Sequence, residues 1–180
     1  ANAGNRERRP MKLISTLAAC ALGAVAMAGA AWAKDPNYVS IPMSIEVNKP
    51  AAEVWAKVGA DYCGISKWIR AGAEVPCVIK SGAGEVGTVR VIAGRVVEVM
   101  TAKAEFGYGY TQPNVEGQWY NLYHGYMEVR PVTATTSKIY YTLVQDQSDK
   151  ADQAAVDADV KRLRTTFEAA LGNMKKMVEG

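Results

Sequence analysis

The sequence predicts an α+β fold in which a curved antiparallel sheet of about seven strands wraps around one long C-terminal helix. Ahead of that helix, from residue 41 to about residue 145, the chain is mostly strand-like, and a one-sided helix must bury its apolar stripe against such a sheet. Near the C-terminus, seven apolar residues recur at intervals of three or four and share one helix face: Val156, Val160, Leu163, Phe167, Leu171, Met174 and Val178.

The N-terminal segment predicts export. We expect translation to start at Met11, after which Lys12, the apolar run over 13–30 and Ala31-Trp32-Ala33 form the three parts of a signal peptide. Residues 1–33 are therefore expected to be upstream residues plus a signal peptide that is cleaved after Ala33. The mature chain, 34–180, is then a single domain in the bacterial periplasm or secreted.

Three alternatives also send the domain across a membrane. The apolar run could remain as a membrane anchor, which would be the only membrane contact, but it is mostly weakly apolar alanine and glycine. Leu17-Ala18-Ala19-Cys20 resembles a lipobox, although Cys20 follows Met11 by only nine residues. Arg8-Arg9 resembles a twin-arginine signal if translation starts upstream.

Removal of the leader leaves a mature chain with 17 basic and 17 acidic residues and no net charge. No basic stripe remains to neutralise a phosphate backbone, so nucleic acid is excluded as a partner. Cys63 and Cys77 remain, and in an oxidising compartment they are expected to form a disulfide. A reactive thiol or metal ligand is the alternative, but His124 has no second histidine beside it, so we expect no metal and no cofactor.

The local patterns predict a series of elements along the mature chain. Alternating apolar residues, a proline-led helix start and glycine turns mark their ends. The expected strands are Tyr38–Val47, Glu74–Lys80, Val86–Ala93, Arg95–Thr101, Ala104–Gln112, Trp119–Pro131 and Lys138–Gln145. The expected helices are Ala51–Val58, Tyr62–Ile69 and a long last one with Ser148 or Asp149 as its N-cap.

This order resembles the START/Bet v 1-like helix-grip superfamily (SRPBCC), especially its polyketide cyclase/dehydrase and lipid-transport-like branch. The resemblance covers nearly all of 38–180. It is carried by Pro50–Trp55, similar to the family's P-x-x-x-V-W run, and by Asp61–Trp68, similar to its second helix. Further matches are Gly87–Arg90, Val97–Val99, Tyr123–Gly125 and the two cysteines, which many members of the branch share. Many relatives follow the helix tryptophan with His-Pro, where this chain has Ile69-Arg70, so no role is carried over for that histidine.

The resemblance implies a cavity that binds an apolar small molecule or lipid, and it implies no shared catalytic apparatus. The residues themselves point weakly the same way, since nine tyrosines against two phenylalanines are typical of apolar walls with polar tips. The candidate pocket residues are Trp68, Arg90, Glu98, Phe106, Tyr108, Tyr110, Tyr123, His124, Tyr141, Leu163 and Phe167.

Several of these assignments have alternatives. Phe106, Tyr108 and Tyr110 share one strand face, and we favour core filling over a pocket wall for them. His124 shares a face with Leu122 and Tyr126 and could be a general base, but a structural or exposed role is favoured and the inward face stays open. Arg90 and Glu98 could form a buried pair at a pocket mouth, although a solvated cross-strand pair is favoured.

Three functions follow, in order of preference. The first is binding of an apolar or amphipathic small molecule in an internal cavity, with no catalytic residue and no covalent chemistry. The second is a cyclase- or dehydratase-type enzyme in which pocket tyrosines and His124 act as acid–base groups, which requires His124 to point inward. The third is an interaction module whose cavity is filled by Trp55, Trp68, Phe106 and Phe167. The sequence leaves the oligomeric state open.

Overall fold

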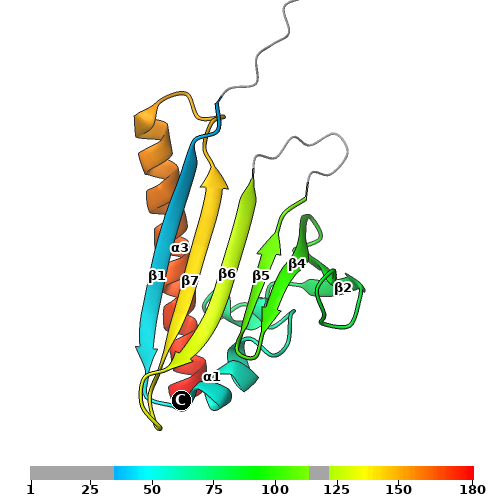
Figure 1. Cartoon of the computed structure of the whole chain (residues 1–180), viewed down its shortest axis with the longest axis vertical. Helices are drawn as coiled ribbons and strands as arrows, with labels where there is room; N and C mark the ends of the chain where they lie inside the picture. Colours follow the sequence, from blue (N-terminus) through cyan, green and yellow to red (C-terminus); the bar gives the residue numbers. More distant parts are fainter. Residues whose placement is uncertain (1–34, 114–121) are drawn as a thin grey trace, which may run out of the picture. The chain divides into compact units, whose positions relative to one another are not determined.

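The structure is a computed structural model that describes residues 35–113 and 122–180 (Figure 1). Seven strands form one antiparallel sheet in the order β1-β7-β6-β5-β4-β3-β2. The strands are β1 (Tyr38–Val47), β2 (Cys77–Ser81), β3 (Val89–Ile92), β4 (Val96–Ala104), β5 (Gly107–Thr111), β6 (Tyr123–Pro131) and β7 (Ser137–Asp146). The helices are α1 (Ala51–Val58), α2 (Ile65–Trp68) and α3 (Gln153–Glu179).

The long helix α3 lies against one face of the sheet, where it packs on β1 and on α1 and α2 (Figure 1). Its predicted apolar stripe is buried along almost its whole length, with only Val160 half-buried. This is the helix-grip arrangement, in which the curved sheet closes on the last helix. Within the part of the chain that the structure describes, no helix is both long and apolar enough to cross a membrane.

The start of α3 differs from the sequence prediction. Asp152 is the N-cap, because its carboxylate accepts a hydrogen bond from the Ala155 amide at 2.8 Å. The expected caps, Ser148 and Asp149, were wrong because the Ser148 amide and hydroxyl both donate to the Asp146 carboxylate, at 2.9 and 3.0 Å. These hydrogen bonds form a local turn at 146–148, so the helix begins only at Gln153.

Three strands and the second helix are shorter than predicted, and one of these strands, β5, covers only Gly107–Thr111 of the expected Ala104–Gln112. β3 begins at Val89, because Gly87 adopts a φ of 95° and the Thr88 hydroxyl accepts from the Gly84 amide at 2.9 Å, which prolongs the turn. β2 begins at Cys77, and α2 covers only Ile65–Trp68 because a turn at 61–64 precedes it. The first residues of the predicted strand Trp119–Pro131 lie outside the described residues.

Two side chains of α3 bind carbonyls on the outer edge of β1. Arg164 Nη1 donates to the Pro42 carbonyl at 3.1 Å, and Lys175 Nζ donates to the Glu46 carbonyl at 2.8 Å. Pro42 itself has no N–H to offer to another strand. The helix therefore holds the sheet both through its apolar face and through the free backbone groups of an edge strand.

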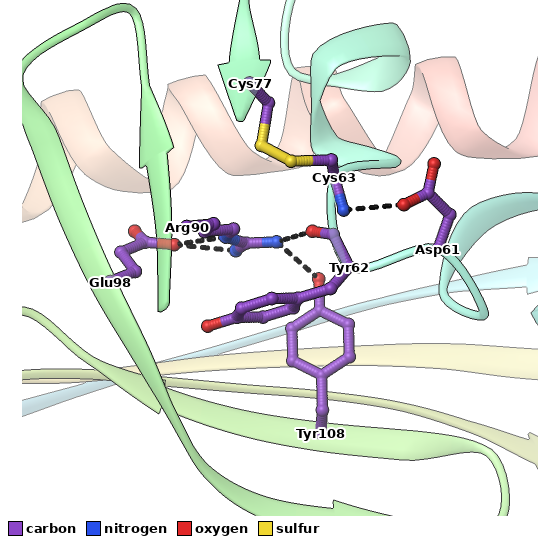
Figure 2. The surroundings of a disulfide bond; sticks show 7 residues. All are labelled: Asp61, Tyr62, Cys63, Cys77, Arg90, Glu98 and Tyr108. Carbon is purple, nitrogen blue, oxygen red and sulfur yellow. Dashed lines mark hydrogen bonds and ion pairs between the residues drawn. A yellow bond between two sulfur atoms is a disulfide. The ribbon is translucent and has the colours of Figure 1, made fainter. Parts of the chain in front are cut away.

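A disulfide fixes the other end of the sheet to the helical segment. Cys63, in the turn before α2, is bonded to Cys77 at the start of β2 with an S–S distance of 2.04 Å (Figure 2). The predicted cysteine pair is confirmed. The bond places Tyr62, the neighbour of Cys63, beside the inner face of β3.

Candidate functional site

The centre of the candidate site is a buried ion pair between β3 and β4. Arg90 lies directly opposite Glu98 in the antiparallel register, and its Nε and Nη2 atoms lie 2.8 and 2.6 Å from Glu98 Oε2. The Arg90 side chain has no exposed surface, and that of Glu98 is 4% exposed. The favoured prediction of a solvated pair was wrong: both side chains point to the inner face of the curved sheet.

Neutral groups surround the pair and satisfy most of its hydrogen-bonding capacity. Arg90 Nη1 donates to the Tyr62 carbonyl and, at 3.4 Å, to the Tyr108 hydroxyl (Figure 2). The Tyr62 ring lies over the guanidinium, 4.0 Å from Cζ to the ring centroid. Gln112 Nε2 donates to Glu98 Oε1 at 3.3 Å. Such contacts offset the large cost of removing two charges from water.

Two polar atoms of this cluster lack a hydrogen-bond partner among the described residues. One is the hydroxyl of Tyr62, a side chain that is only 5% exposed. The other is Arg90 Nη2, which faces the Glu98 carboxylate as an ion pair without a well-aligned hydrogen bond. Buried polar groups are almost always hydrogen-bonded, so the Tyr62 hydroxyl and the remaining N–H of Arg90 Nη2 are the groups of this cluster that can still bind a polar partner.

Aromatic side chains extend the cluster across the inner face of the sheet. The Tyr110 and Tyr141 hydroxyls share a hydrogen bond of 2.8 Å. The Tyr141 ring meets Phe167 of α3 at a centroid distance of 4.8 Å and Trp68 at 6.2 Å. Trp68 donates its Nε1–H to the Val58 carbonyl at 3.0 Å, so its polar end is satisfied inside the protein. These contacts join sheet, short helices and α3 into one aromatic layer.

Burial keeps the tyrosines of this layer neutral. It raises the pKa of Tyr62; the charge of Arg90 opposes the shift and Glu98 adds to it. Burial likewise raises the pKa values of Tyr108, Tyr110, Tyr123 and Tyr141. Burial would lower the pKa of Arg90, but Tyr108 and Glu98 outweigh it and raise the value. Because a general base works best with a pKa near the operating pH, these shifts move the hydroxyls away from acid–base catalysis.

The inward face of β6, which the sequence left open, carries Tyr123, Gly125 and Met127. Gly125 is buried under the Tyr110 ring, and Met127 lies in the core with no exposed surface. His124 points to the opposite, outer face, half-buried beside Gly109 of β5. The only histidine of the chain is thus separated from the buried cluster by the sheet itself.

The structure brings together most, though not all, of the residues that the sequence suggested. Phe106 lies in the turn between β4 and β5, half-buried at the margin of the core. His124 is on the outer face. The residues gathered on the inner side are Trp68, Arg90, Glu98, Tyr108, Tyr110, Tyr123, Tyr141, Leu163 and Phe167.

Two members of the cluster were missed as site residues, Tyr62 and Gln112. The sequence places Tyr62 only in a predicted short helix, and its position next to Cys63 is the one feature that could have indicated its role. The sequence places Gln112 only at the end of a predicted strand, and its neighbours give no sign of a site. Among the described residues, no group of three or more His, Cys, Asp or Glu side chains is placed to hold a metal ion.

The interior beside these residues is filled by protein. Trp68, Arg90, Tyr110 and Tyr141 have no exposed surface. Three side chains near the start of α3 are less enclosed. Val39, Tyr123 and Val160 are only half-buried. Val39 and Tyr123 both pair with Gln145, so they lie on one row across β1, β7 and β6.

Comparison with known proteins identifies the class and then the family. The model of the family "Polyketide cyclase / dehydrase and lipid transport" matches residues 38–179. The fold and this match define a helix-grip protein of the SRPBCC superfamily. The chain belongs to the polyketide cyclase/dehydrase and lipid transport family.

Solved structures share the fold at low identity. A protein from Nitrosospira multiformis is 22% identical over 78% of this chain and 96% of its own, with a TM-score of 0.59. The crystal structure of Ara h 8.0201 is 19% identical over 77% of this chain and 98% of its own, with a TM-score of 0.56. XoxI from Bacillus cereus is 15% identical over 78% of this chain and 96% of its own, with a TM-score of 0.60. No curated protein matches the chain.

Proposed function

We propose that this protein binds an apolar or amphipathic small molecule or lipid between α3 and the inner face of the sheet, without covalent chemistry. The observation that carries the proposal is the buried cluster of Arg90, Glu98 and Tyr62, in which the Tyr62 hydroxyl has no hydrogen-bond partner among the described residues and Arg90 Nη2 has only its ion pair with Glu98. The family, whose description includes lipid transport, supports the same class of ligand.

In this proposal, the ligand enters the protein near the start of α3, beside the three half-buried side chains described above. Val39, Tyr123 and Val160 are less enclosed than the residues deeper in the grip. Because Trp68 and Tyr141 are fully enclosed, access to the deeper cluster requires side chains or the first turns of α3 to move outward. The protein is therefore expected to bind by induced opening.

An enzyme of the cyclase or dehydratase type is the weaker alternative. It needs an acid–base group at the ligand, but His124 lies on the outer face and burial raises the pKa values of the inner tyrosines. A second alternative has a specific observation in its favour: the zero exposure of Trp68, Tyr110 and Tyr141 fits an interaction module with a core filled by its own side chains.

Export is the remaining part of the proposal. We infer that residues 1–33 direct the chain to the periplasm and are removed after Ala33. N-terminal sequencing of protein recovered from bacterial periplasm is expected to begin at Lys34. A lipid-modified N-terminus at Cys20, or a membrane-bound chain that keeps the leader, would replace this part with one of its alternatives.

Native mass spectrometry of the chain purified from cells tests the binding proposal. An added mass that disappears on denaturation is expected, and solvent extraction would then identify the compound. A second arm measures binding of N-phenyl-1-naphthylamine, a neutral fluorescent probe for apolar sites. A bare mass together with no probe binding would overturn the proposal in favour of the filled core, and chemical conversion of the extracted compound by the protein would favour the enzyme.

A further inference from the structure

The buried cluster carries balanced charge. Arg90 and Glu98 neutralise each other, and the side chains that contact them, Tyr62, Tyr108 and Gln112, are uncharged. All three guanidinium nitrogens are engaged: Nε and Nη2 face Glu98 Oε2 at 2.8 and 2.6 Å, and Nη1 donates to the Tyr62 carbonyl and the Tyr108 hydroxyl. The hydrogen-bonding capacity left over belongs to the Tyr62 hydroxyl and to the second N–H of Arg90 Nη2, whose other N–H is turned to Glu98 Oε2 at 2.6 Å.

These two groups lie on the same side of the cluster as the carboxylate. The Tyr62 ring is stacked on the guanidinium, and Figure 2 shows its hydroxyl directed toward the side on which Glu98 lies. Burial raises the pKa of the Tyr62 hydroxyl and the Glu98 charge adds to that shift, which is consistent with their proximity. The site thus offers a donor from Arg90 and a hydroxyl that both donates and accepts, next to a fixed negative charge.

We propose that Tyr62 and Arg90 form a subsite for a neutral oxygen-bearing group of the ligand, such as a hydroxyl, ketone or ester carbonyl, and that Glu98 disfavours carboxylate and phosphate groups. This inference rests on the proposed function and names the chemical class of its ligand. A neutral oxygen accepts from Arg90 Nη2 and exchanges a hydrogen bond with Tyr62, completing both groups. A ligand anion would instead bring a second negative charge beside Glu98 in a site removed from water.

Competition with N-phenyl-1-naphthylamine measures this preference with three ligands of one chain length: decanol, methyl decanoate and decanoate. At neutral pH the carboxyl of decanoate is ionised. The wild-type chain is expected to bind decanol and methyl decanoate about tenfold or more tightly than decanoate. Glu98→Gln leaves Arg90 with no counter-charge, so the ratio of decanoate to decanol affinity is expected to rise about tenfold. Glu53→Gln, on the exposed side of α1, makes the same change in net charge away from the site and leaves the ratio unaltered.

Tyr62→Phe tests the proposed hydrogen bond between the Tyr62 hydroxyl and the ligand oxygen. This test is independent of Glu98→Gln, so it can be made even if Glu98→Gln fails to fold. Tyr62→Phe is expected to weaken decanol binding about threefold to tenfold, the effect of one hydrogen bond, while the affinity for the oxygen-free probe is retained. An unchanged decanol affinity in Tyr62→Phe, or an unchanged decanoate-to-decanol ratio in a folded Glu98→Gln, overturns the inference. If neither the probe nor any of the three ligands binds the wild-type chain, the proposed function fails and the inference with it.

Discussion

Tyrosine and glycine face each other twice across β5 and β6, on opposite sides of the sheet. Tyr110 pairs with Gly125, and its ring covers that glycine on the inner face. One position along, Tyr126 pairs with Gly109, and its ring covers that glycine on the outer face. The Tyr110 ring takes the space that a Cβ at Gly125 would need, whereas the Tyr126 ring would be in tight contact with a Cβ at Gly109.

The two glycines give a matched pair of substitutions. Gly125→Ala would place a Cβ 2.3 Å from the Tyr110 ring, which must move and break its hydrogen bond to Tyr141. Overpacking of this kind costs about 1–3 kcal/mol. In Gly109→Ala the added Cβ would lie 3.2 Å from Cδ2 of Tyr126, so this variant is expected to lose less unfolding free energy than Gly125→Ala. Urea denaturation of both variants measures the difference, and an equal loss would mean that the Tyr110 ring moves freely.

Removal of one partner of the Arg90–Glu98 pair is expected to be more costly than removal of both. Glu98→Ala leaves a buried guanidinium without its counter-charge, which costs about 3–5 kcal/mol. Arg90→Met combined with Glu98→Leu removes both charges and is expected to recover at least half of that loss, although the Tyr62 carbonyl then lacks its donor. A double variant no more stable than Glu98→Ala would contradict this account. Unfolding free energies from urea denaturation make the comparison.

At the scale of elements, the start of α3 depends on one carboxylate. Asp152→Ala removes the hydrogen bond to the Ala155 amide and is expected to destabilise the protein by about 1 kcal/mol. Asp149→Ala is the control, because Asp149 precedes the helix and does not cap it. Thermal unfolding of the two variants should separate them; similar losses would indicate that the helix begins earlier.

The disulfide fixes the segment between α1 and α2 to β2. Cys63 and Cys77 are 14 residues apart, and closing a loop of this length stabilises a protein by about 3 kcal/mol in the chain-entropy model. The double variant Cys63→Ser with Cys77→Ser is expected to lose that amount in urea denaturation. Hydrogen exchange should rise first in 61–68, where Tyr62 covers Arg90. A uniform rise over the whole sheet would show that the bond acts on global stability alone.

The sequence predicted the element order and the buried face of α3 because both depend on periodicity, which is local. It did not predict where β3 begins, because the turn there depends on a positive φ at Gly87 and on a hydroxyl contact from Thr88. The sequence also did not predict that Arg90 is buried. A guanidinium is buried only where partners exist, and one of them, Tyr62, is 28 residues away in the chain and is brought close by the fold.

The side of the sheet on which His124 lies also depended on more than alternation. Alternation assigned His124 and Tyr126 to one face and Tyr123 and Gly125 to the other, but gave no sign of which was inward. The pairing of β6 with β5 and the position of Tyr110 over Gly125 decided it. Register between strands is a property of the sheet, and a single strand does not contain it.

At the scale of the whole molecule, the stability of the protein should fall in acid. Burial would raise the pKa of Asp159, but hydrogen bonds from Arg162 and Gln147 and the charge of Arg162 outweigh it and hold that pKa below its usual range. Because a depressed carboxyl pKa stabilises the folded state only above its unfolded value, this contribution is complete above about pH 4 and is lost as the pH falls further.

Asp159→Asn tests that contribution. Urea denaturation between neutral and acidic pH is expected to show a smaller loss of stability in Asp159→Asn than in the wild-type chain. Asp157→Asn, two positions earlier on the exposed face of α3, is the control and should leave the slope unchanged. Equal slopes in all three proteins would assign the acid sensitivity to other groups, among which Asp146 also has a lowered pKa through hydrogen bonds from Asn37 and Ser148.

The contacts of Arg164 and Lys175 with β1 limit how copies of this molecule could join through their sheets. Open-ended stacking of strands into a fibre needs two receptive edges on every subunit. Here Arg164 and Lys175 bind two carbonyls of the β1 edge, and Pro42 offers no N–H there, whereas no side chain among the described residues binds the terminal strand β2 in this way. Strand addition at β2 can therefore close a two-fold pair, whereas propagation through β1 would first have to displace Arg164 and Lys175.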